Sequence, residues 1–281
     1  MRLPLPTLPA LPRLTAGTPR DAGDPVLNVA HRGASAHAPE NTLAAVRAAV
    51  ARGADLVELD VQRSRDGALV LLHDESLART TNVEQVYPGR APWRVADLTY
   101  DELARLDAGS WKSREHVGEP VPTLGEAVEV LRGSRTGLLL ELKAPHLHPG
   151  MVGEVVAALQ AVPGYVDEAV AAGRLVVESF DLAAVRRHRA LDPRIPVGVL
   201  GSPPRSALPH LATWADQVNP HHRRVDPAYV AQLHDLGLEC LVWTVNHPAA
   251  MRRAVRLGVD GVITDRPDVL RRTLLGYRAA A

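Results

Sequence analysis

Short apolar runs alternate with alanine-rich helical patterns along the chain from Pro25 onward. The runs predict eight main strands, at about 26–30, 55–61, 138–142, 175–178, 196–200, 217–219, 240–245 and 261–264. A further extended piece is expected at 68–72. Helical patterns lie near 41–52, 123–132, 150–171, 181–190, 226–236, 247–256 and 266–276. Continuous apolar strands separated by helices are typical of a parallel sheet buried on both faces.

Eight such strands predict an α/β fold of the TIM (β/α)8 barrel type. An open doubly wound sheet is the main alternative. Its glycine fingerprint is missing from the first turn after a strand, which reads H-R-G-A-S-A over residues 31–36. Residues 74–122 are too long for an ordinary loop between a strand and a helix. They predict a small insertion after the second strand, over the catalytic end of the barrel.

The N-terminal segment, residues 1–24, has a different character from the rest. Pro4, Pro6, Pro9 and Pro12 interrupt what would be the apolar core of a signal peptide. We therefore predict a mobile, proline-rich tail at 1–24 and a single barrel domain at 25–281.

Composition excludes several classes of protein. Lysine plus arginine and aspartate plus glutamate each total 32, so the net charge is +0 and no nucleic-acid partner is expected. The sequence contains no apolar run of the roughly 20 residues that a membrane span needs, so we expect no stable membrane insertion. The single cysteine, Cys240, predicts a buried apolar side chain without an intrachain disulfide, which favours a cytoplasmic location. The oligomeric state is not indicated.

Carboxylates end two of the predicted strands. Residues i and i+2 of a strand face the same side, so Glu58 and Asp60 project together, as do Glu141 and Lys143. Three carboxylates in one barrel mouth would repel one another unless a cation joined them. Hard oxygen ligands predict one divalent cation, Mg²⁺ or Ca²⁺. The alternative is that these carboxylates pair with the abundant arginines.

Histidines and cations also lie at strand ends. A lone histidine is more often structural, but His31 and His73 both lie at strand ends beside carboxylates, which favours a general acid and base pair. Arg32 and Lys143 would place positive charge in the same mouth, which favours an anionic substrate such as a phosphate. Only Lys112 and Lys143 are lysines among the 32 cationic residues, so a lysine is a rare choice in this chain. Together these groups favour phosphoryl transfer or phosphodiester cleavage.

Several motifs, in order from about residue 28 to 270, resemble the glycerophosphodiester phosphodiesterase family. They are H-R-G-A-S-A-H-A-P-E-N-T (31–42), G-A-D-L-V-E-L-D-V (53–61), D-G-A-L-V-L-L-H-D (66–74), L-A-R-T-T-N (77–82), D-A-G-S-W (107–111), P-T-L (122–124), E-L-K (141–143), W-T-V-N (243–246) and G-V-D-G-V-I-T-D-R-P (258–267). Each piece alone is weak, but the set is specific.

The resemblance implies a TIM-barrel enzyme that uses a divalent metal to hydrolyse glycerophosphodiesters to sn-glycerol 3-phosphate and an alcohol. Its partner would be this small-molecule substrate. By motif position, Glu58, Asp60 and Glu141 would bind the metal, His31 and His73 would be the acid and base, Arg32 would hold the phosphate, and Lys143 would lie beside the site.

Four further residues are candidates with an alternative each. Glu40 and Asn41 lie in P-E-N-T, where Glu40 could orient His31 or Arg32, and Asn41 or Thr42 could simply cap the first helix. Trp243 resembles an apolar wall for the substrate glycerol, or is a core tryptophan. Phe180 could line the pocket or plug the barrel. Asp265, in T-D-R-P, is interpreted as part of a helix start.

Two other functions remain open at this stage. A lysophospholipase D-like phosphodiesterase would share the fold and site but would need a wide apolar entrance, for which Tyr87, Trp93 and Trp111 of the insertion are the candidates. A non-catalytic phosphate-binding barrel would have lost a catalytic histidine or a metal carboxylate. None of these residues is missing.

Overall fold

Eight parallel strands form a closed barrel in the computed structural model, which describes residues 25–278. The barrel strands are β1 (Leu27–His31), β2 (Leu56–Arg63), β4 (Gly137–Leu142), β5 (Leu175–Ser179), β6 (Val197–Leu200), β7 (Gln217–Asn219), β8 (Glu239–Val242) and β9 (Gly261–Thr264). Each pairs in parallel with its neighbours, and the pairing of β1 with both β9 and β2 closes the ring. The predicted TIM barrel is confirmed, and the doubly wound alternative is wrong. The predicted tail, residues 1–24, lies outside the described residues.

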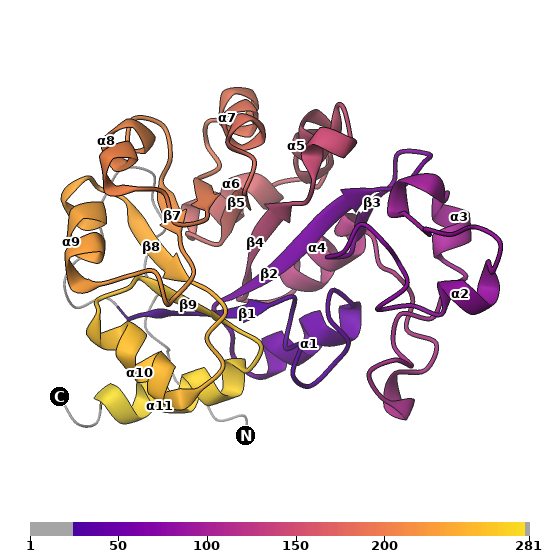
Figure 1. The fold of residues 1–281 in the computed structure, drawn as a ribbon, viewed down its shortest axis with the longest axis horizontal. Helices are drawn as coiled ribbons and strands as arrows, with labels where there is room; N and C mark the ends of the chain where they lie inside the picture. The colour runs from indigo at the N-terminus through magenta and orange to yellow at the C-terminus, as the bar shows by residue number, and fades with distance from the viewer. Residues whose placement is uncertain (1–24, 279–281) are drawn as a thin grey trace, which may run out of the picture.

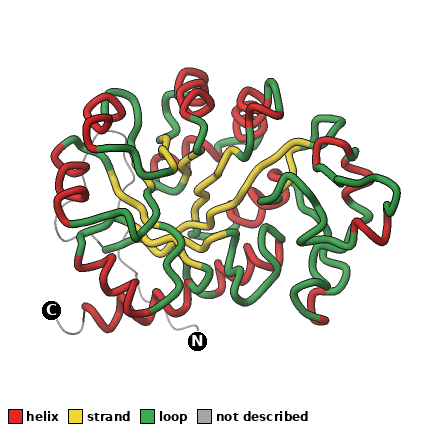
Figure 2. The backbone as a smooth tube through the Cα atoms, viewed as in Figure 1, coloured by secondary structure: helices red, strands yellow, loops and turns green. Residues whose placement is uncertain are grey.

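Helices surround these strands (Figure 1; Figure 2, red around yellow). They are α1 (Leu43–Ala51), α4 (Leu124–Arg132), α5 (Met151–Gln160), α6 (Tyr165–Ala171), α7 (Leu182–Leu191), α8 (Leu208–Leu211), α9 (Pro227–Asp235), α10 (Pro248–Arg256) and α11 (Pro267–Arg278). Two short 3-10 turns lie in the loops, η3 (Pro145–Leu147) and η4 (Arg205–Ala207). No helix within the described range is both long and apolar enough to cross a membrane.

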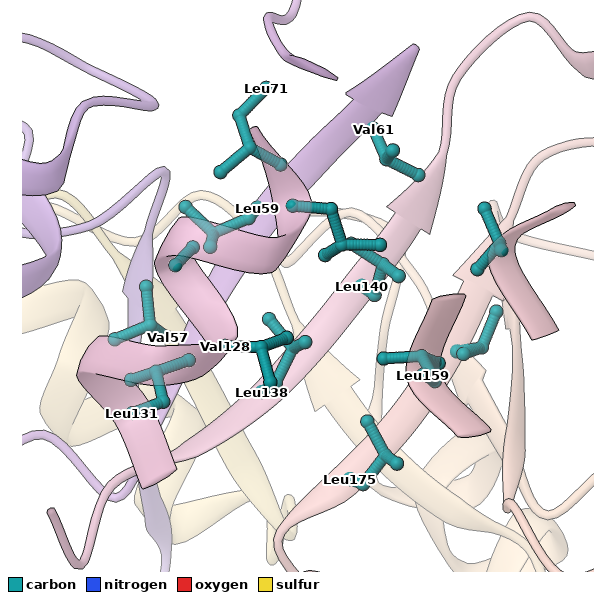
Figure 3. Close-up of a cluster of buried hydrophobic side chains, with 14 of the residues drawn as sticks. Val57, Leu59, Val61, Leu71, Val128, Leu131, Leu138, Leu140, Leu159 and Leu175 are labelled. Atoms are coloured by element: carbon teal, nitrogen blue, oxygen red, sulfur yellow. The ribbon is translucent and has the colours of Figure 1, made fainter. Parts of the chain in front are cut away.

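Two separate cores follow from the alternation of side chains along each strand. On β2, Val57, Leu59 and Val61 point outward and pack with Leu131 of α4 and Leu140 of β4 (Figure 3). The opposite parity fills the barrel interior with a smaller apolar cluster, namely Leu27, Val29, Leu56, Leu139, Val176, Leu241 and Ile263. Both faces of the sheet are thus buried, and the inward face becomes polar toward the carboxyl ends of the strands.

A long excursion, residues 64–123, separates β2 from α4 and contains the predicted insertion. β3 (Leu69–Leu71) runs back antiparallel to the end of β2, followed by α2 (Val83–Val86), η1 (Val95–Asp97), α3 (Tyr100–Leu103) and η2 (Arg114–His116). The excursion buries its own apolar cluster, including Leu77, Val95, Leu98, Leu103 and Leu106. It extends to the right of the barrel in Figure 1. This separate core lets the insertion hold its shape beside the barrel mouth.

Two helix predictions were wrong in detail. The single helical pattern at 150–171 is two helices, α5 and α6, because Pro163 and Gly164 interrupt it, and Gly164 adopts a positive φ of 74°. Between β6 and β7 no helix is predicted, yet η4 and the short α8 form there. The prolines of this segment conceal its helical pattern in the sequence, and Pro209 lies in the first turn of α8, where a proline is tolerated.

Candidate active site

The inward-facing residues of each strand lead directly into the site. On β1 the series is Leu27, Val29 and His31, and on β4 it continues from Leu139 to Glu141 and Lys143. Because successive inward residues are two positions apart, an apolar interior and a polar mouth lie on the same face of the same strand. The barrel therefore gathers these polar groups above its apolar interior.

Glu58, Asp60 and Glu141 form an acidic cluster, as predicted. One carboxylate oxygen from each lies within 4.8 Å of the other two, and all three side chains are buried. Burial, then the negative charges of Asp60 and Glu141, raises the pKa of Glu58 well above its ordinary value. Burial and Asp60 likewise raise the pKa of Glu141. The cluster is thus short of positive charge, which is the property expected of a cation site.

Lys143 and Arg32 border this cluster. Lys143 Nζ lies 2.7 Å from Glu141 Oε1 and 3.4 Å from Asp60 Oδ1. The Arg32 main-chain N–H donates to Glu58 Oε2 at 2.7 Å, and its Nε lies 3.5 Å from Asp60 Oδ2. Burial tends to raise the pKa of Asp60, but Lys143 and Arg32 outweigh it and hold that pKa below its ordinary value.

Both predicted histidines are paired with a carboxylate. His31 Nδ1 lies 2.7 Å from Asp265 Oδ1, and His73 Nδ1 lies 2.6 Å from Asp74 Oδ1. A carboxylate on Nδ1 favours the tautomer that carries its proton there, and leaves Nε2 for exchange with a ligand. Burial lowers the pKa of His73. The two pairs are suited to proton transfer.

The β2–β3 hairpin brings His73 to the mouth. Leu71 pairs with Val61, and the Leu72 N–H donates to the Asp60 carbonyl at 3.0 Å, so the chain returns alongside the acidic cluster. His73 follows immediately. It therefore reaches the site from an antiparallel strand outside the ring.

The P-E-N-T motif divides its work among three side chains. Thr42 caps α1 by accepting from the Ala45 N–H, and Asn41 Nδ2 donates to Asp60 Oδ2 at 2.7 Å. Glu40 accepts from Arg32 at 2.8 Å, so it orients Arg32 and not His31. Both readings of the motif thus hold, for different residues.

Arg79, which lies in the motif L-A-R-T-T-N but was not predicted to belong to the site, connects two parts of it. Its Nη1 and Nη2 donate to the two oxygens of Glu40 at 2.9 and 2.7 Å, and its Nε donates to Asp74. Burial tends to raise the pKa of Asp74, but hydrogen bonds from Arg79 and His73 outweigh this effect and lower the pKa to about 2. Asp74 is therefore a permanent anion beside His73.

Two joined cavities open above the acidic cluster. The inner chamber, about 140 Å³, contains His31, Arg32 and Glu58 and is walled by Trp243, Leu200 and Ile263. The outer groove, about 650 Å³, lies over the loops that follow β3, β4 and β5. His73, Glu141, Lys143 and Phe180 line both cavities. Trp243 and Phe180 thus line the mouth, their ring centroids 5.7 Å apart in an edge-to-face contact.

Two inward-facing carboxylates were not predicted to belong to the site. Asp265 was interpreted as helix-start chemistry, but it accepts from His31, Ser35 and Asn246. Glu178 lines the inner chamber, where burial raises its pKa to about 7 although Asn219 donates to it. Each lies two residues after an inward apolar residue, Ile263 or Val176. This spacing of two residues along the strand was the sequence signal that could have placed both carboxylates on the inward face.

The loops with further histidines differ in their relation to the site. His221 packs against Trp243 with ring centroids 5.3 Å apart, behind the chamber wall. His146 lines the outer groove. His148 is buried with 4% of its surface exposed, and Cys240 is buried as predicted.

Comparison with known proteins gives a consistent set of relatives. The model of the glycerophosphoryl diester phosphodiesterase family matches residues 31–269. YhdW of Bacillus subtilis is 38% identical over 250 residues, which cover 86% of this chain and 95% of YhdW. A glycerophosphodiester phosphodiesterase of the same species is 33% identical over 268 residues, covering 90% and 88%. A phosphodiesterase of Oleispira antarctica, solved in complex with the product sn-glycerol-3-phosphate, has a TM-score of 0.76 at 32% identity and covers 88% and 95%.

Proposed function

Because the chain belongs to the glycerophosphoryl diester phosphodiesterase family, we propose that it hydrolyses glycerophosphodiesters to sn-glycerol 3-phosphate and an alcohol. One observation carries the proposal: two histidines, each paired with an aspartate, line one chamber at the mouth of the barrel together with two cations and with two members of the cluster of three carboxylates. The product bound to the Oleispira antarctica relative is consistent with it.

The acidic cluster fits a divalent cation. Glu58, Asp60 and Glu141 offer hard oxygen ligands, and Asp60 Oδ1 is buried and accepts no hydrogen bond from any described residue. A bound Mg²⁺ or Ca²⁺ would relieve the repulsion among the three carboxylates and supply positive charge to a phosphate oxygen. These three side chains are the ones we propose as its ligands.

The chain's own groups divide the remaining work. Arg32 and Lys143 would bind the phosphate, because both present positive charge to the chamber. His31 and His73, anchored through Nδ1, would use Nε2, one to accept a proton from the attacking hydroxyl and the other to protonate the leaving alcohol. Trp243, Leu200 and Ile263 give the inner chamber an apolar wall against which glycerol carbons can pack.

The first experiment measures glycerol 3-phosphate release from glycerophosphocholine with and without a chelator, and after adding back Mg²⁺ or Ca²⁺. Activity that is lost with the chelator and restored by one cation supports the proposal. Absence of glycerol 3-phosphate with every cation and several head groups would rule out the activity.

Variants separate the two kinds of residue. His31→Ala and His73→Ala should each lower kcat by roughly 10²–10⁴ and leave the affinity for the metal, measured by calorimetry, unchanged. Glu58→Ala should weaken metal binding first. His37→Ala is the matched control, because His37 lies in the loop that follows His31 but is exposed and bonds to Asp268. If the His31 and Glu58 variants keep wild-type rates, the site is elsewhere.

Lysophospholipids are a second candidate substrate class. Phe180, which lines the outer groove, is 53% exposed, and Leu147 and Leu182, which each follow a lining residue in the sequence, are 46% and 45% exposed. The insertion aromatics Tyr87, Trp93 and Trp111 line neither cavity. Choline release from lysophosphatidylcholine, compared with glycerophosphocholine, discriminates the two. The small inner chamber favours the deacylated glycerol of the first proposal.

A further inference from the structure

The outer groove has the position expected for the leaving alcohol, if the proposed function holds. A phosphodiester carries two alcohols, and the inner chamber has room and an apolar wall for one of them, the glycerol. The second alcohol, which is the leaving group, must therefore lie outside the inner chamber. The outer groove shares His73, Glu141 and Lys143 with the chamber, so a group on the other side of the phosphorus would enter it directly.

Two carboxylates add negative charge to this groove. Glu75 follows β3 and Asp181 follows β5, on either side of β4 in the sheet order. Neither forms an ion pair with a described lysine, arginine or histidine, and Asp181 accepts only from the first N–H groups of α7. In contrast, Asp74 is paired with Arg79 and Lys143 with Glu141.

An aromatic ring lies beside these carboxylates. Phe180 is the only phenylalanine in the chain, yet 53% of its surface is exposed, and Trp243 supports it edge-to-face. Lys143 Nζ lies 5.9 Å from the centre of the Phe180 ring, so a cation already lies near this ring. An aromatic ring combined with nearby carboxylates is the chemistry that recognises organic ammonium groups.

We propose that the outer groove binds the leaving alcohol and selects one that carries a positively charged nitrogen, of the choline or ethanolamine type, over neutral alcohols. Glu75 and Asp181 supply the long-range attraction, and Phe180 supplies the contact surface. The inference rests on the proposed function and adds a head-group class to it.

The test compares kcat/KM for glycerophosphocholine and glycerophosphoethanolamine with kcat/KM for the neutral glycerophosphoglycerol and glycerophosphoinositol. The wild-type protein should favour the two cationic head groups by about tenfold. Glu75→Gln combined with Asp181→Asn should remove most of this preference and leave glycerophosphoglycerol turnover within about twofold, since asparagine can still cap α7. Glu84→Gln, which neutralises an exposed acid in α2, should change nothing.

Free alcohols separate charge from shape. Choline should inhibit more strongly than 3,3-dimethylbutan-1-ol, which has the same shape without the charge, and the double variant should abolish that difference. Equal wild-type turnover of cationic and neutral diesters, or an equal loss on both in the double variant, would overturn the head-group proposal alone. Failure to cleave any diester would overturn the proposed function as well.

Discussion

Each histidine of the site depends on one carboxylate for its orientation. Asp265 is held by Ser35 and Asn246 as well as by His31, so the position of His31 Nδ1 is well determined. Burial tends to raise the pKa of Asp265, but the hydrogen bond from His31 helps to lower it. Asp265 therefore stays ionised and accepts hydrogen bonds. Asp265 thus fixes the tautomer of His31, although the sequence indicated only His31 as a member of the site.

Asp265→Asn should lower kcat by roughly 10² or more, because an amide can donate to Nδ1 and stabilise the wrong tautomer of His31. Steady-state kinetics with a saturating metal ion would measure it, with KM little changed. Asp268→Asn, which removes a carboxylate from the exposed His37 in the same region, is the control. Equal kcat values for the two variants would contradict a role for Asp265.

Gly33 is needed for the conformation of the first loop. Its φ is +83°, and a Cβ there would lie 2.6 Å from Ala45 Cβ and 2.7 Å from the Ala45 carbonyl carbon. Both backbone strain and overlap with α1 therefore oppose any side chain.

Gly33→Ala should lower the free energy of unfolding by about 2 kcal/mol or more, as measured by urea denaturation. Gly67→Ala is a matched control with a φ of +96° and no atom within 4 Å of its added Cβ. In this control the free energy of unfolding should fall only by the backbone strain, about 1 kcal/mol. A Gly33 variant as stable as the Gly67 variant would mean that α1 yields easily.

At the scale of elements, Arg79 joins the insertion to the barrel. It binds Glu40 from the loop between β1 and α1 and Asp74 from the segment after β3. Glu40 in turn orients Arg32, and Asp74 orients His73. The placement of a phosphate-binding candidate and of a histidine thus depends on contact between two separate segments.

Arg79→Gln should therefore lower kcat by about tenfold, because it loosens Glu40 and Asp74 together. Arg79→Lys should recover only part of the lost kcat, since an ammonium cannot reproduce the planar set of donors that the guanidinium offers to two carboxylates. Arg90→Gln is the control: it breaks a comparable ion pair, with Glu102, that lies wholly inside the insertion. A loss in the Arg90 variant as large as in the Arg79 variant would indicate a general effect on the insertion.

For the whole molecule, folding stability in mild acid should depend on a histidine that has no proposed role in the active site. His188 of α7 is fully buried, and neither ring nitrogen has a hydrogen-bond partner among the described residues. Burial lowers its pKa to about 4. In the unfolded chain the pKa is near 6.5, so the unfolded state binds the extra proton first as the pH falls.

Folding stability should accordingly be unaffected by His188 above pH 6.5 and should decrease by about 3 kcal/mol between pH 6.5 and 4 through this group. Urea unfolding of His188→Leu over that range should show a shallower loss than the wild type. His210→Leu removes an exposed imidazole of α8 and should keep the wild-type slope. Identical slopes for all three proteins would contradict the assignment.

The local pattern of the sequence was sufficient for the strands and for the side of the sheet on which the strand-end candidates lie. A strand such as Leu138–Leu142 is apolar on both faces, and β4 forms there because only a doubly covered sheet buries both. Once eight strands form a barrel, the period of two determines that Glu58 and Asp60, and Glu141 and Lys143, face inward at one end. These predictions needed no knowledge of distant contacts.

Only the tertiary structure decided which distant groups meet. Asp265 reaches His31 because closure of the ring makes β9 the neighbour of β1, although 234 residues separate the two side chains. His73 approaches Asp60 because β3 folds back on β2, and Arg79 meets Glu40 because the insertion packs beside the first loop. Side-chain periodicity is a local property that the chain carries in its order of residues. Pairing across the closed barrel depends on packing between segments, which no local pattern contains.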